Sequence, residues 1–171
     1  MPRLQRSRIH LRRIVAGDER RFLASVEASR ALHRPWVHAP STPLQFRIYA
    51  RRVRKPENRG FLVCLRESGE LVGVINLSNI VLGYFRSAYL GYYAFGGFER
   101  QGLMREGLRT AVRHAFKSLK LHRLEANIQP GNAASIALVR SCGFRKEGFS
   151  PRYLKIGGRW RDHERWAIIA S

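Results

Sequence analysis

The feature that most constrains the fold is a long amphipathic helix that follows a strand and a glycine-containing turn. Apolar side chains recur at helical spacing between residues 103 and 119, while basic side chains repeat every fourth residue on another face, at Arg105, Arg109, Arg113 and Lys117. This periodicity predicts a helix with one apolar and one charged face. The strand-like segment SAYLGYYAF and the turn GGFERQGLM stand directly before it. The sequence therefore predicts a strand, a turn and a helix in direct succession.

The rest of the chain alternates between strand and helix patterns. A half-buried strand is predicted at residues 8–14, and Asp18 can cap the helix that follows. A loop with several prolines at residues 33–43, suited to lining a site, separates that helix from a short one at residues 44–53. The remaining predicted elements are an antiparallel meander at 61–67, 70–82 and 87–95, a strand at 123–128, a helix at 132–141 and a strand pair turning at Gly157 and Gly158.

Length and composition predict a single domain over residues 1–171. A chain of 171 residues with 44% apolar residues can close one core and is too short to suggest two. Its longest apolar runs fall far short of the roughly 20 residues of a membrane-spanning helix, and no apolar segment after the basic N-terminus fits a signal peptide. We therefore expect a cytoplasmic protein with no membrane contact.

The two cysteines predict reduced thiols and no bound metal. Cys64 and Cys142 show no CxxC spacing, and no histidine cluster completes a metal site. A nucleophilic role for Cys142 would need a partnered histidine, which the sequence does not place.

The net charge is the most unusual part of the composition. The chain has 32 Lys and Arg against 12 Asp and Glu residues, which leaves +20. Such an excess favours a polyanionic partner, with basic clusters at residues 3–21 and 47–55 and along the predicted helix at 103–119. The alternative interpretation is that the arginines only solvate the surface.

The junction between the strand and the long helix has the chemistry of a phosphate site. The first turn of a helix carries amides without intrahelical partners, and these amides and the macrodipole attract anions. Gly102 lacks the Cβ that would obstruct a close approach. Glycines between a strand and a helix are also ordinary turn residues, and neither GxGxxG nor GxxxxGK[ST] is present. From the motif alone, both interpretations stay open.

Three segments, in this order and spacing, carry a resemblance to a known family. They are YLGYYAFGGFERQGLMREGL, HRLEANIQPGNAASIALVRSCGFRKEGF and YLKIGGRWRDH. The combination resembles the GCN5-related N-acetyltransferases, and among them it is similar to the ribosomal-protein-alanine N-acetyltransferases. The resemblance covers about residues 8–169. It implies an α/β (α+β) fold with a mixed, mostly antiparallel, twisted sheet of about six to seven strands, flanked by helices, whose strands splay around an acetyl-CoA cleft.

The resemblance also implies which residues bind acetyl-CoA. The family's phosphate loop corresponds to Glu99–Met104, and the residues that would hold the pyrophosphate are Arg100, Gln101, Gly102, Leu103 and Met104. The sequence departs from the family at Glu99, where Gln or Arg is usual, and at Met104, where a small residue is usual. The preceding strand would pair with the pantetheine arm and offer an amide to the oxyanion, at Tyr92, Tyr93 and Ala94.

Three further residues are candidates for the chemistry. Asn132 and Ser135 form an N-x-x-S pair at a predicted helix start, where ordinary capping is the alternative interpretation. The resemblance implies that Asn132 holds the pantetheine region and that Ser135 protonates the departing thiolate, since Val139 stands where many relatives carry a tyrosine. Glu125 is the candidate general base because some relatives carry a glutamate there. A structural carboxylate paired with an arginine is the alternative.

These features predict direct transfer of an acetyl group from acetyl-CoA to an amine in a ternary complex. Only an unprotonated amine attacks a thioester, and the pKa of an α-amine is about 8, against about 10.4 for a lysine side chain. A protein N-terminus therefore suits an enzyme without an evident strong base, and the resemblance implies a small-subunit ribosomal protein, with ribosomal RNA as a further contact.

Two alternatives stay open for the function. An acetyltransferase of small amines or antibiotics would have cationic substrates, which a charge of +20 repels. A ribosome- or RNA-binding module on the same fold would not consume the coenzyme.

Overall fold

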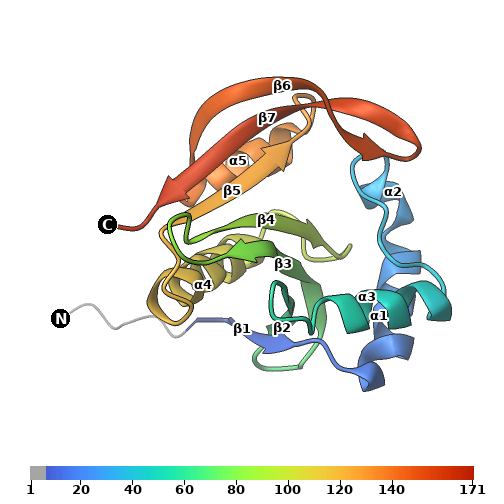
Figure 1. Cartoon of the computed structure of the whole chain (residues 1–171). Helices are drawn as coiled ribbons and strands as arrows, with labels where there is room; N and C mark the ends of the chain where they lie inside the picture. Colours follow the sequence, from blue (N-terminus) through green and yellow to red (C-terminus); the bar gives the residue numbers. More distant parts are fainter. Residues whose placement is uncertain (1–6) are drawn as a thin grey trace.

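The computed structural model describes residues 7–171, which form a seven-stranded sheet with helices on both faces (Figure 1). The strands are β1 (Ile9–Arg13), β2 (Arg59–Leu65), β3 (Leu71–Val81), β4 (Ser87–Ala94), β5 (Arg123–Ile128), β6 (Arg145–Ile156) and β7 (Arg159–Ile169). The helices are a 3-10 turn, η1 (Ala16–Asp18), and α1 (Glu19–Ala28), α2 (Arg30–His33), α3 (Pro43–Arg52), α4 (Leu103–Lys117) and α5 (Ala133–Ser141).

The strands lie in the order β1-β2-β3-β4-β5-β7-β6, and every neighbouring pair is antiparallel except β4 and β5. These two parallel strands share register only from Ser87 opposite Arg123 to Tyr89 opposite Glu125. Beyond that point they diverge, as Figure 1 shows, while β3 and β7 still cover their outer edges. The predicted mixed, mostly antiparallel sheet with splayed strands is confirmed.

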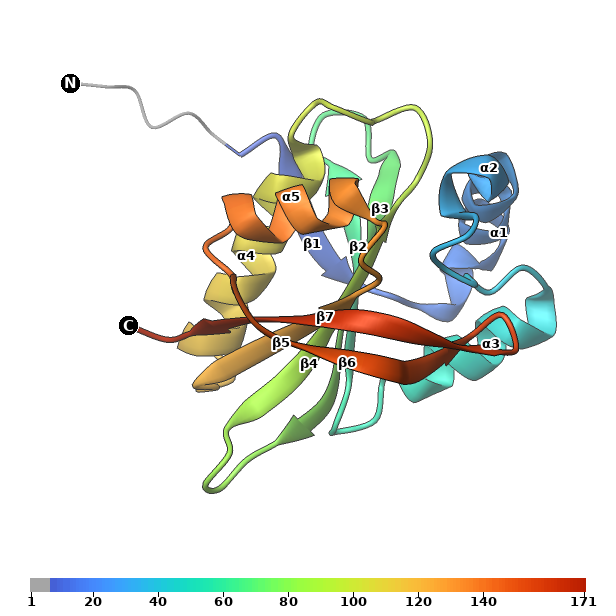
Figure 2. The same ribbon diagram turned by 90° about the horizontal axis from the view of Figure 1, so that it is seen from above.

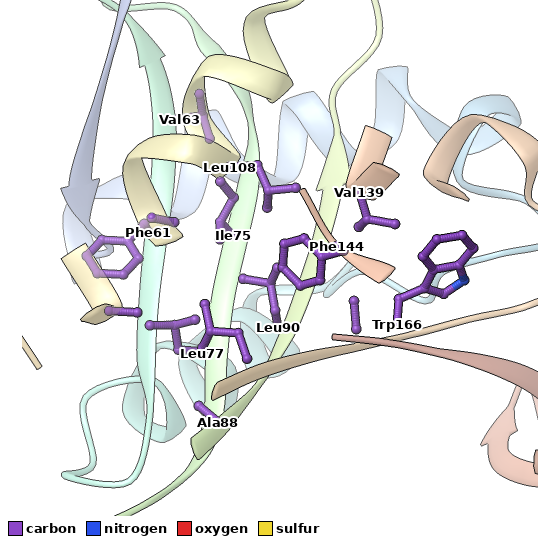
Figure 3. Packing of buried hydrophobic residues seen from close by; sticks show 14 of the residues in the cluster. Phe61, Val63, Ile75, Leu77, Ala88, Leu90, Leu108, Val139, Phe144 and Trp166 are labelled. Atoms are coloured by element: carbon purple, nitrogen blue, oxygen red, sulfur yellow. The ribbon is translucent and has the colours of Figure 1, made fainter. Parts of the chain in front are cut away.

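Two apolar layers hold the helices on the sheet. Helices α4 and α5 cover one face and α1 to α3 the other (Figure 2). Leu108 of α4 and Val139 of α5 are fully buried in the first layer, where they pack with strand residues such as Ile75, Leu90 and Trp166 (Figure 3). The second layer joins Phe22 of α1 and Phe46 of α3, whose ring centroids are 5.0 Å apart, to the opposite face.

The side chains along β4 alternate between these layers because successive strand residues point to opposite faces. Leu90 and Tyr92 pack into the α4 and α5 layer, whereas Tyr93 packs into the α1 and α3 layer. The side chains of neighbouring β4 residues therefore point to opposite sides of the opening between β4 and β5.

The first helix differs from its prediction in two ways. Asp18 precedes α1, but its carboxylate accepts hydrogen bonds from the Arg12 guanidinium at 2.6 and 2.9 Å and from the Val15 amide at 2.9 Å, so it does not cap that helix. The predicted continuous helix also breaks at Ser29. The Ser29 hydroxyl donates to the Ser25 carbonyl at 2.6 Å and accepts from the Gly96 amide at 2.9 Å, which fastens the break to the segment after β4.

No helix among residues 7–171 has both the length and the apolar composition needed to cross a bilayer. The basic cluster predicted at residues 3–21 begins outside the described residues.

Candidate active site

A cavity of about 850 Å³ opens where β4 and β5 separate. Its walls come from both strands, from the first turns of α4 and α5, from the loop after α2 and from the β6–β7 hairpin. Because residues of both sheet faces line it, the cavity connects the α4 and α5 side with the α1 and α3 side. We call the part on the α4 and α5 side, which includes Arg100 and Gly102, the phosphate half. The part on the α1 and α3 side, which includes Arg52 and Tyr93, is called the acceptor half.

The phosphate half contains the start of α4. Gly102 precedes the helix in the left-handed conformation, with φ of 74°. A Cβ at this position would meet only the guanidinium nitrogens of Arg8 and Arg105, at 3.6 Å each. Among the described residues, no group accepts a hydrogen bond from the amides of residues 101–105. Free amides at a helix N-terminus and two guanidinium groups beside the glycine have the chemistry of an anion site.

The two departures from the family's loop pattern leave these amides free. The Glu99 carboxylate turns back and accepts a hydrogen bond from the Gly97 amide at 2.8 Å. The Met104 sulfur packs against β3, where it lies 2.6 Å from the position of a Cβ on Gly73. Both side chains are engaged elsewhere, so backbone groups form the rim of the loop.

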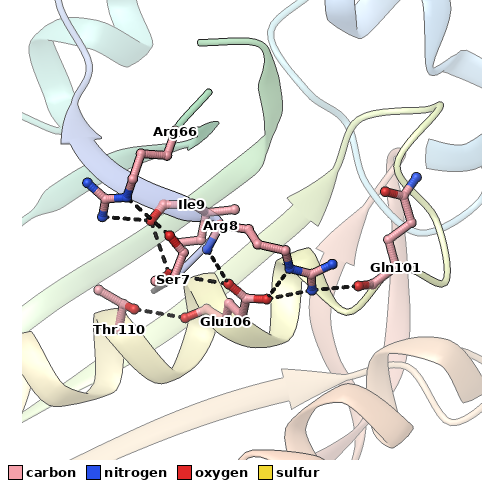
Figure 4. Close-up of polar contacts among 7 residues, drawn as sticks. All are labelled: Ser7, Arg8, Ile9, Arg66, Gln101, Glu106 and Thr110. Carbon is pink, nitrogen blue, oxygen red and sulfur yellow. Dashed lines mark hydrogen bonds and ion pairs between the residues drawn. The ribbon is translucent and has the colours of Figure 1, made fainter. Parts of the chain in front are cut away.

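An ion pair braces the phosphate loop against β1 (Figure 4). The Arg8 guanidinium donates to Glu106 at 2.7 Å and to the Gln101 carbonyl at 2.8 Å, while the Ser7 hydroxyl and the Arg8 amide also donate to Glu106. Burial tends to raise the pKa of Glu106, but these bonds outweigh it and lower that pKa. Sequence reasoning missed Arg8, because its contact with Gln101 joins residues 93 positions apart.

A hydroxyl pair lies between β4 and α5. The Tyr92 hydroxyl is 2.6 Å from the Ser135 hydroxyl, and it donates to the Ser135 carbonyl at 3.1 Å. Asn132 caps α5 by accepting from the Ser135 amide at 3.2 Å. Burial raises the pKa of Tyr92, so its phenol stays protonated at neutral pH.

Sequence reasoning selected Tyr92 for its backbone and missed its hydroxyl. Val139, which stands where many relatives carry a tyrosine, is fully buried in the core. The Tyr92 phenol of β4 lies next to Ser135, and only the packing of α5 on β4 reveals the pair.

The loop at residues 33–43 lines the acceptor half, as predicted, with Trp36, Val37, His38 and Pro40 among the lining residues. The His33 Nε2 donates to the Ala94 carbonyl at 2.8 Å, which fixes the start of the loop to the end of β4. The Trp36 ring lies 3.2 Å from the Cβ position of Gly131, before α5, and His38 lies 2.7 Å from that of Gly157, in the β6–β7 turn. The loop thus spans the cavity and contacts both of its outer walls.

The structure brings most of the predicted site residues together. The cavity is lined by Tyr92, Tyr93, Ala94, Arg100, Gly102, Leu103, Met104, Asn132 and Ser135. Gln101 lies in the same loop but outside the lining, because its carbonyl faces Arg8 and its side-chain amide donates to the Gly97 carbonyl at 3.3 Å.

Glu125 lies outside the cavity. It borders a separate, smaller depression near Ser87 and Tyr89, and its carboxylate accepts a hydrogen bond from Arg123 at 2.7 Å. Arg123 also pairs with Glu147. This geometry matches the structural alternative for Glu125 and does not support the proposed general base.

Known proteins are similar to this chain in both sequence and fold. Residues 8–145 match the acetyltransferase (GNAT) domain family. The chain is 44% identical over 94 residues to the [ribosomal protein uS5]-alanine N-acetyltransferase of Escherichia coli, a match that covers 55% of this chain and 48% of that enzyme.

Solved structures extend the likeness to nearly the whole chain. Mycobacterium smegmatis RimJ in complex with CoA-disulfide superposes with a TM-score of 0.87 and 28% identity, over 95% of this chain and 82% of that one. A spermidine N-acetyltransferase of Vibrio cholerae in complex with CoA and spermine superposes with a TM-score of 0.81 and 25% identity, over 95% and 96% of the two chains. The chain belongs to the GNAT family of N-acetyltransferases, with acetyl-CoA as co-substrate, and it is similar in sequence to a ribosomal-protein-alanine enzyme and in fold to RimJ.

Proposed function

We propose that this enzyme acetylates the N-terminal α-amine of a protein, with a small-subunit ribosomal protein as its substrate. The observation that carries the proposal is the composition of the acceptor half. Among the described residues that line the cavity, the only carboxylate is Glu99, which belongs to the phosphate loop. The acceptor half instead presents aromatic, amide and imidazole groups and the Arg52 guanidinium. Such a site suits an acceptor with a single amine, such as a chain terminus.

The phosphate half fits acetyl-CoA. We assign the pyrophosphate to the loop from Arg100 to Met104, whose free amides favour an anion. The edge of β4 from Tyr92 to Ala94 faces the opening and has no partner on β5, so it can pair with the pantetheine amides. Asn132 borders the same opening at the start of α5.

The chemistry proceeds by direct attack. The lone pair of the amine attacks the thioester carbon, the C–N bond forms, and the C–S bond breaks as the oxyanion collapses. An amide of the β4 edge stabilises that oxyanion, and the Ser135 hydroxyl gives its proton to the thiolate. Tyr92 can restore the Ser135 proton across their 2.6 Å hydrogen bond.

The cysteines give no support to a covalent acetyl-enzyme. Neither Cys64 nor Cys142 is among the described residues that line the cavity. Burial raises the pKa of the Cys142 thiol, which lowers its thiolate fraction.

A second candidate is the acetylation of a small polyamine, favoured by the likeness to the spermidine enzyme. Polyamines carry several ammonium groups, and buried cations need paired partners. The acceptor half offers Arg52 and no carboxylate within the described residues, which favours the protein N-terminus.

We also propose that the basic surface contacts ribosomal RNA. The α4 residues Arg105, Arg109, Arg113 and Lys117 are exposed. Arg13, near Arg54 and Arg59, has its pKa lowered by burial and by these two like charges. Concentrated positive charge of this kind binds phosphate backbones by releasing counterions.

A panel of acceptors tests the function. Purified enzyme and acetyl-CoA are mixed with short peptides that have a free N-terminus, the same peptides blocked at the N-terminus, free lysine and spermidine, and the release of free thiol is measured. We expect kcat/KM to be highest for free-terminus peptides and absent for the blocked ones. Preferential turnover of spermidine would establish the second candidate instead.

A further inference from the structure

Two residues that line the cavity each carry a buried side-chain oxygen without a hydrogen-bond partner among the described residues. These oxygens are the Tyr93 hydroxyl on β4 and the Asn127 side-chain carbonyl on β5. A buried polar atom without a partner costs stability, so such atoms point to a ligand that supplies the missing bond.

The strand register places both oxygens on the acceptor half. Tyr89 and Glu125 are opposite each other on the parallel strands, so their side chains share a face. Tyr93 follows Tyr89 by four residues and Asn127 follows Glu125 by two, and an even spacing keeps them on that same face. Tyr93 also packs with the α1 and α3 layer, which agrees with this assignment.

A third group reaches the same face from β7. Asn127 is opposite Arg165, and His163 precedes Arg165 by two residues, so the His163 side chain points to the acceptor half as well. His163 is 3% exposed and lines the cavity. Its Nδ1 is 2.9 Å from the Arg161 carbonyl, which can only accept, so Nδ1 carries the proton. Nε2 is thereby the acceptor nitrogen of the neutral ring, and within the described residues it has no partner.

We propose that Tyr93, Asn127 and His163 form the seat of the acceptor amine, an inference that rests on the proposed function. The Tyr93 and Asn127 oxygens share one N–H of the neutral amine and so orient its lone pair toward the thioester, while its second N–H donates to His163 Nε2. His163 Nε2 takes the proton that the nitrogen loses as the C–N bond forms, while the thiolate receives its proton from the Ser135 side. The seat holds no carboxylate, and it therefore selects an amine that sheds its proton readily.

Conservative variants separate this role from a structural one. Tyr93→Phe and Asn127→Leu remove oxygens that have no partner in the free protein, so we expect the melting temperature to stay equal or rise. The KM for a short peptide with a free N-terminal alanine should rise about 10-fold, the value of one hydrogen bond to a reacting group, with an unchanged KM for acetyl-CoA. The exposed Tyr84→Phe is the matched control and should change neither quantity.

The His163 variants test the proton transfer. His163→Gln keeps most of the side-chain volume and should lower kcat about 100-fold, while His163→Ala should recover activity when imidazole is added. His122→Ala, at an exposed position outside the cavity lining, should show neither effect. Folding of each variant is checked by circular dichroism.

The outcomes distinguish a failure of the proposed seat from a failure of the proposed function. Peptide turnover that is unchanged in the Tyr93, Asn127 and His163 variants would overturn the seat and leave the function standing. If the wild-type enzyme acetylates spermidine instead of the peptide, the proposed function falls, and the same variants scored with spermidine decide the seat. A lower melting temperature for Tyr93→Phe, or no imidazole rescue of a folded His163→Ala, would also overturn the seat.

Discussion

Removal of the Ser135 hydroxyl should slow catalysis far more than it weakens the fold. In Ser135→Ala the 2.6 Å contact with Tyr92 is lost, but the Tyr92 hydroxyl keeps its 3.1 Å bond to the Ser135 carbonyl. The buried phenol is therefore not left without a partner, and the free energy of unfolding should fall by only about 1 kcal/mol.

The effect on kcat follows from the leaving group. General acids contribute about 10²- to 10⁴-fold, and a thiol with a pKa near ~8.5 already leaves more readily than an alcohol. We therefore expect kcat to fall by about 100-fold, the lower end of that range, with the affinity for acetyl-CoA nearly unchanged.

The assay is thiol release under saturating acetyl-CoA, combined with calorimetric titration of coenzyme binding. Tyr92→Phe should reproduce the loss, and the double variant should be no slower than the slower single variant, because the two hydroxyls act as one unit. Ser141→Ala is the matched control on the same helix, since its exposed hydroxyl lies outside the cavity lining and bonds to the Leu138 carbonyl at 2.7 Å and to the Cys142 sulfur at 3.9 Å. A wild-type kcat in folded Ser135→Ala would refute the reasoning, and additive losses would refute the shared unit.

Four further predictions follow from the same structure. Gly102→Ala and Gly83→Ala both force a side chain into a positive φ, of 74° and 68°, so each should lose about 1 kcal/mol of stability, but only Gly102→Ala should weaken acetyl-CoA binding in a titration. Glu125→Gln should leave the pH–rate profile unchanged, and a shifted profile would restore its role as base. Asp18→Asn should cost about 2 kcal/mol in denaturant unfolding. In the wild type, burial raises the pKa of Asp18, but the bonds from Arg12 and Val15 lower it below the ordinary value. The stability that Asp18 contributes is thus present above about pH 4 and lost as the pH falls through the lowered value. The protein should cosediment with small ribosomal subunits at low salt and dissociate as salt rises, whereas the rate of peptide acetylation should change little. Absence of cosedimentation at low salt would indicate that the arginines only solvate the surface.

Periodicity in the sequence was enough to predict most of the fold. The α4 pattern, the meander of β2 to β4 and the turn at Gly157 and Gly158 are all encoded by neighbours along the chain, and each element appears where it was expected. The break at Ser29 was not predictable in this way, because it depends on a bond to the Gly96 amide in a segment far along the chain.

The site was predictable only where local motifs define it. The amides at Gly102 and the cap at Asn132 follow from helix starts, and the structure places both at the cavity. The Tyr92 hydroxyl, the Arg8 brace and the face shared by Tyr93 and His163 depend on strand register and helix packing. A single sequence carries no local signal for these relations.

The short contact between β4 and β5 has a consequence for how the protein responds to its coenzyme. Within residues 7–171 the ladder between these strands has three residue pairs, from Ser87 with Arg123 to Tyr89 with Glu125. A ligand that pairs with the free edge of β4 takes the place of missing strand contacts, so its binding energy becomes folding energy. Amide hydrogen exchange along that edge should slow on coenzyme binding, and the melting temperature should rise with coenzyme concentration. Both measurements therefore report whether the coenzyme is bound, and neither needs an acceptor substrate.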